Sequence, residues 1–276
     1  MLPSTGKISL GDIRTEFAGT DARLSAYYAR GPGIPKSGQI AASQFRGRSA
    51  LVTRGLVLDV DTKNPACFGS STQRISAVGS YTYTANKALP VDGTDAMYFD
   101  GATTLSAGTY PYPADTFSIE AWCNPQATHE IDAETLTPPA PNTTPGTAGQ
   151  RWITSPSHQG DVNGGAGISV GTNGISVYEH GSGYMPSLLT YQAAISGMTH
   201  LMVVYTAKRP ALYVNGTLVR TGLLSQRGAV YGNIYGIGYG SYGNFIGYIG
   251  CIRQFNVALT ASEVAQNYNA YKPYYQ

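Results

Sequence analysis

The sequence predicts a mainly β fold, a two-sheet antiparallel jelly-roll sandwich that follows a small N-terminal helical module. Charged residues make up only 12% of the chain, which holds 34 glycines and 21 tyrosines. This composition favours strands and tight turns over helices. From residue 55 onward, short runs that alternate apolar and polar residues are separated by turn signals. Many short strands with hardly a helix among them are typical of two packed sheets.

The expected strands show a period of two. In TFSIEAWCNP, alternate residues from Phe117 to Cys123 share one face, while Ser118, Glu120 and Trp122 share the other. The segments that alternate in this way, fully or in part, are residues 55–61, 95–101, 116–125, 167–178, 200–222 and 244–257.

Two of these segments also predict hairpins. GISVGTNGISVY reads as two strands joined by a Gly-Thr-Asn-Gly turn. The segment 200–222 offers a long strand, a turn near Lys208–Pro210, a second strand and then Asn215-Gly216. Asn-Gly between β-type runs is the strongest short-range hairpin signal.

One helix is expected to close the chain, with its body over Ala261–Asn269. Thr260 and Glu263 have the spacing of a capping box, and Leu259 and Val264 occupy the positions of a hydrophobic staple.

The first fifty residues contain an internal repeat. LPSTGKISLGDI at residues 2–13 returns as IPKSGQIAASQF at 34–45. In the first copy, Ser9 and Asp12 predict a capping box, and Ile13 and Phe17 form an apolar stripe at i, i+4. We expect a second short helix around residues 22–30, with Leu24, Tyr27 and Tyr28 facing inward.

Together these features predict two domains, a helical module over residues 1–50 and a sandwich over residues 55–276. Residues 1–50 hold seven Lys/Arg and three Asp/Glu, a net charge of +4, while the remainder carries −2. A mildly basic module suits an acidic partner surface, and the bias is too weak to indicate nucleic acid. The module is also open to a simpler interpretation, as a subdomain with no separate role.

Residues 126–150 stand apart from this pattern. Four prolines and six threonines in QATHEIDAETLTPPAPNTTPGTAGQ oppose regular structure. We expect a long exposed loop between two strands, and loops of that length are usually functional or mobile.

Several classes of site are disfavoured by spacing. The cysteines lie far apart with no CxxC pair, which indicates buried or free thiols. The four histidines lack metal-ligand spacing, and His200 is expected to be structural. Gly167–Gly171 matches G-x-S-x-G around Ser169, and Gly238–Gly243 matches G-x-G-x-x-G, but neither leads into a helix. No apolar run is long enough to span a bilayer, and no signal peptide is expected.

The ordered set GLVLDVDTKNPACF, YFDGATTLS, TFSIEAWCNP, LYVNGTLV and FIGYIGCIRQFNVALTASEVAQNYNAY resembles the laminin-G-like, concanavalin A-type jelly-roll domains. The version it resembles is common in tailed-phage virion proteins, and the similarity covers roughly residues 55–272. LPSTGKISLGDIRTEF also resembles a phrase of phage structural proteins.

The resemblance implies a non-enzymatic virion protein, assembled in the host cytoplasm, that displays a lectin-like sandwich as a decoration, collar or tail-fibre component. The alternative is a receptor- or glycan-binding adhesin, and a depolymerase comes third. The implied partners are other virion proteins, further copies of the chain in a homo-oligomer and a host surface glycan, without nucleic acid or membrane insertion. The residues expected to carry virion attachment are Ile8, Ile13, Phe17, Ile40 and Phe45.

Hydrolysis is not implied. Related glucanases place acidic residues at alternate positions of one strand, whereas Glu120 is followed at that spacing by Trp122 and Asn124. No cofactor is expected other than a possible Ca²⁺, because sandwiches of this kind often hold one at a loop rim. Oxygen ligands suit calcium, although aspartate is also an ordinary turn residue. The aspartates that cluster in the first third are Asp59, Asp61, Asp92, Asp95 and Asp100.

The segment VYGNIYGIGYGSYGNFIGY places tyrosines among glycines. Aromatic rings on rigid loops can stack on sugars or pack against a protein partner. Half-buried rings that fill the gaps left by glycine are the alternative. The candidate carbohydrate or partner surface comprises Tyr231, Tyr235, Tyr239 and Tyr242.

Overall fold

The computed structural model describes residues 2–3, 5–17, 19–27, 34, 38–46, 50–79, 81–89, 96–107, 112–136, 146–160, 162–181 and 185–276. The chain divides into two compact units. The first unit comprises residues 1–53, 215–217 and 260–276, and the second comprises residues 54–214 and 218–259. The division into domains 1–50 and 55–276 stays a prediction, and the structure groups the C-terminal helix with the first unit.

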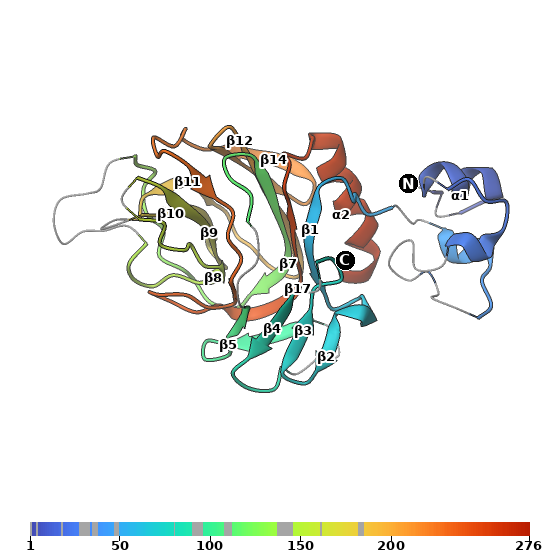
Figure 1. Ribbon diagram of the computed structural model, residues 1–276, viewed down its shortest axis with the longest axis horizontal. Helices are drawn as coiled ribbons and strands as arrows, with labels where there is room; N and C mark the ends of the chain where they lie inside the picture. Colours follow the sequence, from blue (N-terminus) through green and yellow to red (C-terminus); the bar gives the residue numbers. More distant parts are fainter. Residues whose placement is uncertain are drawn as a thin grey trace. The chain divides into compact units, whose positions relative to one another are not determined.

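The sandwich predicted from the sequence is confirmed (Figure 1). Among the described residues, seven strands form the first sheet in the order β1-β17-β7-β12-β13-β14, with β5 also paired to β17. Its strands are β1 (Leu56–Asp61), β5 (Met97–Asp100), β7 (Phe117–Pro125), β12 (Thr199–Thr206), β13 (Arg209–Val214), β14 (Thr217–Thr221) and β17 (Ile246–Phe255).

The second sheet has ten strands within the described part of the chain, in the order β11-β10-β9-β8-β16-β6-β4-β3-β2, and β15 pairs with β9 in parallel. Its strands are β2 (Phe68–Ser70), β3 (Gln73–Ile75), β4 (Thr82–Ala85), β6 (Leu105–Ala107), β8 (Trp152–Thr154), β9 (Gly164–Gly171), β10 (Gly174–His180), β11 (Ser187–Gln192), β15 (Val230–Tyr231) and β16 (Gly236–Ile237). A short 3₁₀ helix, η3 (Pro65–Cys67), precedes β2.

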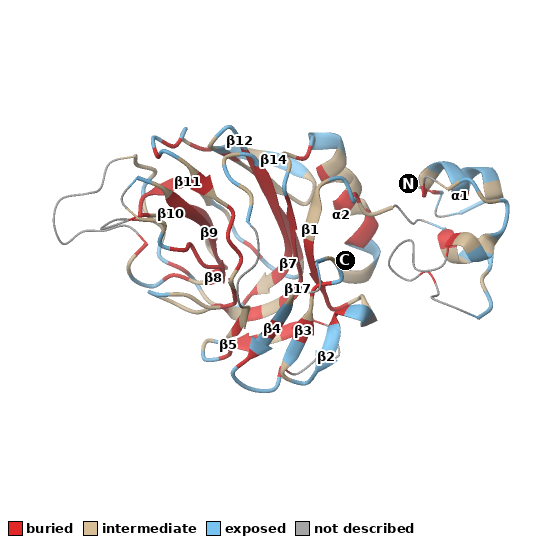
Figure 2. Cartoon of the chain, in the orientation of Figure 1, coloured by how far each residue is buried: buried red, intermediate tan, exposed pale blue. Residues whose placement is uncertain are grey.

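The inner faces of both sheets form one hydrophobic core. Ile119 and Val203 come from the first sheet, Ile168 and Val177 from the second, and all four belong to the same buried cluster. Figure 2 shows the central strands of both sheets coloured as buried. The alternation in β7 does not separate a buried face from a solvent-exposed face. Every residue from Phe117 to Cys123 is buried, so both faces of this part of the strand are covered.

The two expected hairpin turns of the first sheet are confirmed. Ala207 and Lys208 join β12 to β13 with φ of 46° and 70°, and Asn215 and Gly216 join β13 to β14 with φ of 49° and 78°. Positive φ at both central residues is the type I′ geometry, whose twist matches that of the flanking strands.

The C-terminal helix α2 (Ala261–Tyr275) starts where the sequence predicts. Thr260 Oγ1 accepts a hydrogen bond from the Glu263 amide, and the Thr260 amide donates to Glu263 Oε2 at 2.8 Å. The predicted end at Asn269 is wrong, because the helix continues through Pro273 in its last turn. Three tyrosine rings near its end lie close together, with centroids of Tyr271 and Tyr275 6.5 Å apart.

The sequence repeat is also a structural repeat. Each copy has one glycine with left-handed backbone, Gly6 at φ 86° and Gly38 at φ 82°, and in both a Cβ atom would meet open space. Each copy ends on a fully buried side chain, Ile13 in one and Phe45 in the other. These shared features are consistent with two similar corners, of which residues 4 and 35–37 lie outside the described part of the chain.

Short helices complete these corners. The first copy forms α1 (Leu10–Glu16), where Ser9 Oγ accepts from the Asp12 amide at 3.1 Å and confirms the predicted capping box. The second forms a 3₁₀ helix, η2 (Ala42–Phe45). Between them lies the 3₁₀ helix η1 (Leu24–Tyr27), within the span 22–30 in which a helix is expected, and residues 28–30 lie outside the described residues. In it Tyr27 is buried and Leu24 half-buried, and Tyr28 lies outside the described residues.

The long loop has no regular structure where it is described, as expected, but it is not uniformly exposed. His129 and Gln150 are buried, and Glu134 forms an isolated bridge with Ser187 beside β11. Arg220 of β14 binds Glu134 through two hydrogen bonds of 2.9 and 2.6 Å. Such a two-point ion pair holds residues 126–136 against the sandwich. The prolines of this loop lie in residues 137–145, outside the described residues.

Candidate functional site

Three of the predicted binding tyrosines are half-buried. Tyr231 ends β15 and lies edge-on against Tyr112, with ring centroids 5.5 Å apart. Tyr235 and Tyr239 flank β16 and make an edge-on contact at 6.2 Å. A Cβ on Gly236 would lie 2.7 Å from the Tyr239 ring. Tyr239 thus packs on bare backbone, which is the gap-filling role left open above.

Tyr242 is different because its side chain reaches solvent. It is 46% exposed and has φ of 75°, a conformation that costs a bulky L-residue about 1–2 kcal/mol. The residue lies in the four-residue turn 240–243, in which the Gly243 amide donates to the Gly240 carbonyl at 3.4 Å. Tyr242 occupies the third position, which a positive φ normally reserves for glycine.

This turn, called here the tyrosine turn, is fixed to the second sheet. The Trp152 indole donates to the Ser241 carbonyl at 2.7 Å, and the Gln150 amide donates to the Tyr242 carbonyl at 3.1 Å. A Cβ on Gly243 would lie 1.9 Å from the Gln150 carbonyl oxygen. The glycines of the G-x-G-x-x-G match therefore allow close backbone approach, and they precede β17 rather than a helix.

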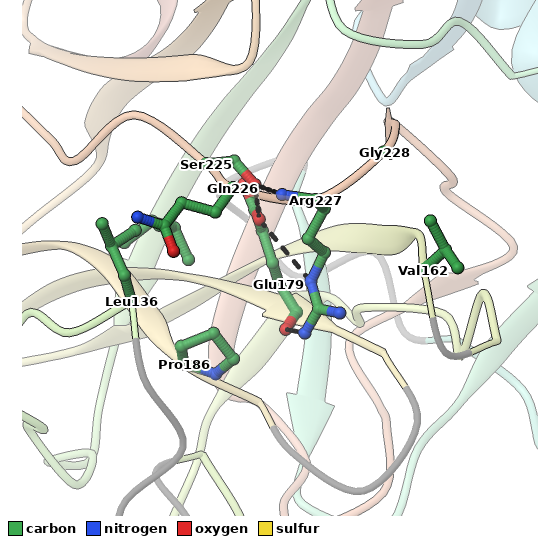
Figure 3. Close-up of a pocket in the computed structure, with 9 residues that line it drawn as sticks. Leu136, Val162, Glu179, Pro186, Ser225, Gln226, Arg227 and Gly228 are labelled. Atoms are coloured by element: carbon green, nitrogen blue, oxygen red, sulfur yellow. Dashed lines mark hydrogen bonds and ion pairs between the residues drawn. The ribbon is translucent and has the colours of Figure 1, made fainter.

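A second candidate is a pocket of about 300 Å³. Figure 3 shows Leu136 and Gln226 on one side of Arg227, Val162 on the other, and Glu179 beside its guanidinium. The pocket, called here the Glu179 pocket, is lined by Leu136, Val162, Glu179, Pro186, Leu188, Ser225, Gln226, Arg227 and Gly228. No pattern in the sequence indicated this pocket.

Glu179 of β10 is a buried acid in this pocket, only 1% exposed. Its carboxylate accepts hydrogen bonds from the hydroxyls of Ser225, at 2.5 Å, and Tyr205, at 3.2 Å. Burial raises the pKa of Glu179 to about 7, although these donors and the nearby charges of Arg227 and Lys208 act in the opposite direction. Near neutral pH the carboxyl group is therefore partly protonated.

Arg227 lies in a channel that two glycines leave open. Cβ atoms on Gly164 and Gly181 would lie 2.4 and 2.1 Å from its side chain. The guanidinium donates to the carbonyls of Asn163, at 3.3 Å, and Glu179, at 3.4 Å. Its Nε lies 3.8 Å from Glu179 Oε2. The fold therefore places a fixed cation beside the buried acid.

The aspartates considered for calcium have other partners. Asp59 and Asp61 each bind Arg253 at 2.8 Å, and Glu120 binds the same guanidinium at 3.2 Å. Asp100 pairs with Lys87, while residues 92 and 95 lie outside the described part of the chain. Within the described residues, no group of three or more His, Cys, Asp or Glu side chains is placed to hold a metal ion.

The G-x-S-x-G serine is buried inside β9. Ser169 Oγ lies 3.1 Å from His129 Nδ1 and accepts from the Arg151 amide at 2.9 Å. Burial lowers the pKa of His129 to about 4. A serine with no exposed surface cannot meet a substrate, so the pair fixes the loop to the sheet. His200 is likewise buried beside Trp122, with ring centroids 5.4 Å apart.

The residues expected to carry virion attachment form the core of the N-terminal segment. Ile13, Phe17 and Phe45 are buried, and Ile8 and Ile40 pack against them half-buried. The rings of Phe17 and Phe45 meet edge-on at 5.6 Å. These side chains shape the segment, and their role in virion attachment stays a prediction. The cysteines are free and buried, as expected, and no described helix is long and apolar enough to cross a membrane.

Comparison with known proteins identifies one family. The family model of the concanavalin A-like lectin/glucanases superfamily matches residues 92–265. No curated protein sequence matches the chain.

Solved structures share the fold at low identity. The binding domain of Paraclostridial Mosquitocidal Protein 1 is 15% identical with a TM-score of 0.54, over 79% of this chain and 52% of that one. The binding domain of botulinum neurotoxin DC in complex with SialylT is 12% identical with a TM-score of 0.52, over 78% and 51%. Trypanosoma rangeli sialidase is 14% identical with a TM-score of 0.52, over 83% and 35%. The similarity thus spans about half of each toxin domain and about a third of the sialidase, and it concerns the fold.

Proposed function

Because the chain belongs to the concanavalin A-like lectin/glucanases superfamily, we propose that it is a non-catalytic protein whose sandwich binds a glycan in a lectin-like manner. Two of the structures that share its fold are binding domains, and one of these is in complex with SialylT. A receptor on a host surface is the partner class that fits such a module.

The observation that carries this proposal is the tyrosine turn. Backbone strain at an exposed residue persists only where the surrounding structure enforces it, and it is concentrated at functional sites. Glycine would relieve the strain at position 242, yet the chain presents an aromatic ring there. Aromatic faces on rigid turns stack on sugar rings, with a hydroxyl left for hydrogen bonding.

The same proposal excludes hydrolysis. Glycosidases need two carboxyl groups that flank one bond in an accessible cleft. The buried carboxylates of Asp59, Asp61 and Glu120 converge instead on Arg253. In the Glu179 pocket, the lining residues include no second acid.

Replacing Tyr242 with glycine tests the binding role. We expect at least about tenfold weaker binding of any glycan that the full-length protein retains on an array. Stability should stay unchanged or rise by up to about 1 kcal/mol, because glycine accepts the left-handed backbone. Titration calorimetry and thermal unfolding measure the two quantities.

Ala207→Gly is the matched control, because Ala207 is also exposed with positive φ but contributes no ring. It should bind as the wild type does. Undiminished binding by Tyr242→Gly would remove the tyrosine turn from the site.

The finer part of the proposal is that the protein is a virion component, a decoration, collar or tail-fibre protein of a tailed phage. Residues 1–50 would fix the displayed sandwich to other virion proteins in an oligomeric arrangement. The repeated corners and the net charge of +4 in this segment support it, since repeated basic corners suit a repeated acidic surface.

Ile13→Asp tests the attachment role. A buried aspartate should collapse the small core around Phe17 and Phe45. We expect the variant to be absent from purified particles, as measured by mass spectrometry. The purified variant should keep the β-strand signal of its sandwich in circular dichroism. Normal incorporation of the variant would contradict attachment through this segment.

A further inference from the structure

The charges around the Glu179 pocket are unequal. Its lining holds one acid, Glu179, and one permanent cation, Arg227. A second cation lies directly behind, because Lys208 Nζ donates to the Arg227 carbonyl at 2.7 Å. With Glu179 ionised, these three groups sum to +1, and with Glu179 protonated they sum to +2. An approaching anion is attracted in either state, whereas an ammonium group meets two like charges in a poorly hydrated site.

The acid itself is already engaged by the protein. The hydroxyls of Ser225 and Tyr205 both bind the Glu179 carboxylate. Arg227 is held in place between Gly164 and Gly181. The guanidinium is planar and offers paired donors, which suit a carboxylate better than a single hydroxyl.

The size and walls of the pocket limit its occupant. A volume of about 300 Å³ is at the lower end of the range for ligand pockets and suits one ring-sized group. Leu136, Pro186 and Leu188 provide apolar walls, and Val162 is 68% exposed at the lining. Apolar walls beside polar groups match a sugar ring, which has both kinds of surface.

We propose that the Glu179 pocket binds one carboxylate-bearing sugar unit of an acidic glycan, with Arg227 as the group that selects the carboxylate. This rests on the lectin-like function proposed above and adds the ligand class. Glu179 takes up a proton when the acidic sugar binds, because a second carboxylate nearby favours the neutral form of Glu179. With a pKa of about 7, Glu179 is partly ionised at neutral pH before binding. Within the described residues, the charged or titratable groups that act on Glu179 are Tyr205, Lys208 and Arg227.

The test compares methyl α-D-galacturonoside with methyl α-D-galactoside, which differ at C6 by a carboxylate against a hydroxymethyl group. We expect the full-length protein to bind the galacturonoside at least about tenfold more tightly. Calorimetry at low ionic strength limits screening of the charges. Equal affinities, or no binding of the acidic sugar, would overturn the proposal.

Two substitutions of opposite charge at the exposed Val162 test where the acidic sugar binds without disturbing the core of the fold. Val162→Lys should raise the affinity for the galacturonoside several-fold, and Val162→Asp should lower it by a similar factor, with the galactoside unaffected by both. Glu179→Gln, which mimics the protonated acid, should raise the affinity for the acidic sugar about tenfold at pH 8 and little at pH 5. Insensitivity of the acidic sugar to all three variants would place its binding elsewhere.

The outcomes also separate the two proposals. If Tyr242→Gly abolishes array binding while the acidic sugar shows no preference, the lectin-like function stands and the assignment of the Glu179 pocket fails. If the acidic sugar binds in the pocket while Tyr242→Gly has no effect, the reverse holds.

Discussion

Replacing Arg253 with methionine is expected to unfold the sandwich or to destabilise it by about 3–5 kcal/mol, the range for removal of one partner from a buried ion network. Arg253 is fully buried on β17 and binds Asp59 and Asp61 of β1 at 2.8 Å and Glu120 of β7 at 3.2 Å. Burial raises the pKa of Asp59, which Arg253 opposes and Asp61 reinforces. Without the guanidinium, the three carboxyl groups lose the cation that binds all of them.

Urea unfolding at pH 7 measures the loss. The control keeps Arg253→Met and adds Asp59→Asn, Asp61→Asn and Glu120→Gln, which removes the unpaired charges at nearly constant shape. We expect the control to recover much of the lost stability, because replacing a whole buried ion network is far less harmful than breaking it. A wild-type midpoint for Arg253→Met alone would show that the network contributes nothing.

The second large effect concerns pH. Glu179 has a pKa of about 7 in the folded chain against an ordinary value of 4.5, so the folded state holds more protons between these values. Its contribution to stability is therefore full below about pH 4.5 and is lost as the pH rises to about 7. The loss amounts to about 3 kcal/mol. His129, with its pKa lowered to about 4, acts with the opposite sign over much of the same range, so the wild-type curve alone hides the effect.

Glu179→Gln isolates this contribution. We expect the variant to exceed the wild type in unfolding free energy at pH 8 by up to about 3 kcal/mol and to match it near pH 4. Glu134→Gln is a control of opposite sign. Burial acts to raise the pKa of Glu134, but hydrogen bonds from Arg220 and Thr190 keep it below its ordinary value. A difference between wild type and Glu179→Gln that is constant with pH would contradict the raised pKa.

Much of the fold was predictable because local signals agree with it. The period of two located β1, β5, β7, β9, β10 and the strands from β12 to β14 and β17. Asn215-Gly216 and the capping residues Ser9 and Thr260 fixed turns and helix starts. Strands such as β15 and β16 have two residues each and are too short to show a period, so they depend on neighbours distant in sequence.

The sites were less predictable. The tyrosine segment was apparent from composition, but only the backbone angle and exposure distinguish Tyr242 from the packed ring of Tyr239. The Glu179 pocket joins residues from 136 to 228 with no regular spacing, and each looks ordinary in its own segment. The long loop was predicted as exposed from its prolines and threonines, a pattern that does not indicate the burial of His129 and Gln150.

Whether a displayed sandwich binds glycans without altering them is decided most directly by one measurement. Full-length protein is incubated with the glycans that it retains on an array. The glycans are then recovered, and their masses are measured by mass spectrometry. We expect saturable retention of at least one glycan and recovery of that glycan with its mass unchanged. Recovery of shorter fragments, or retention of no glycan at any protein concentration, would contradict the account.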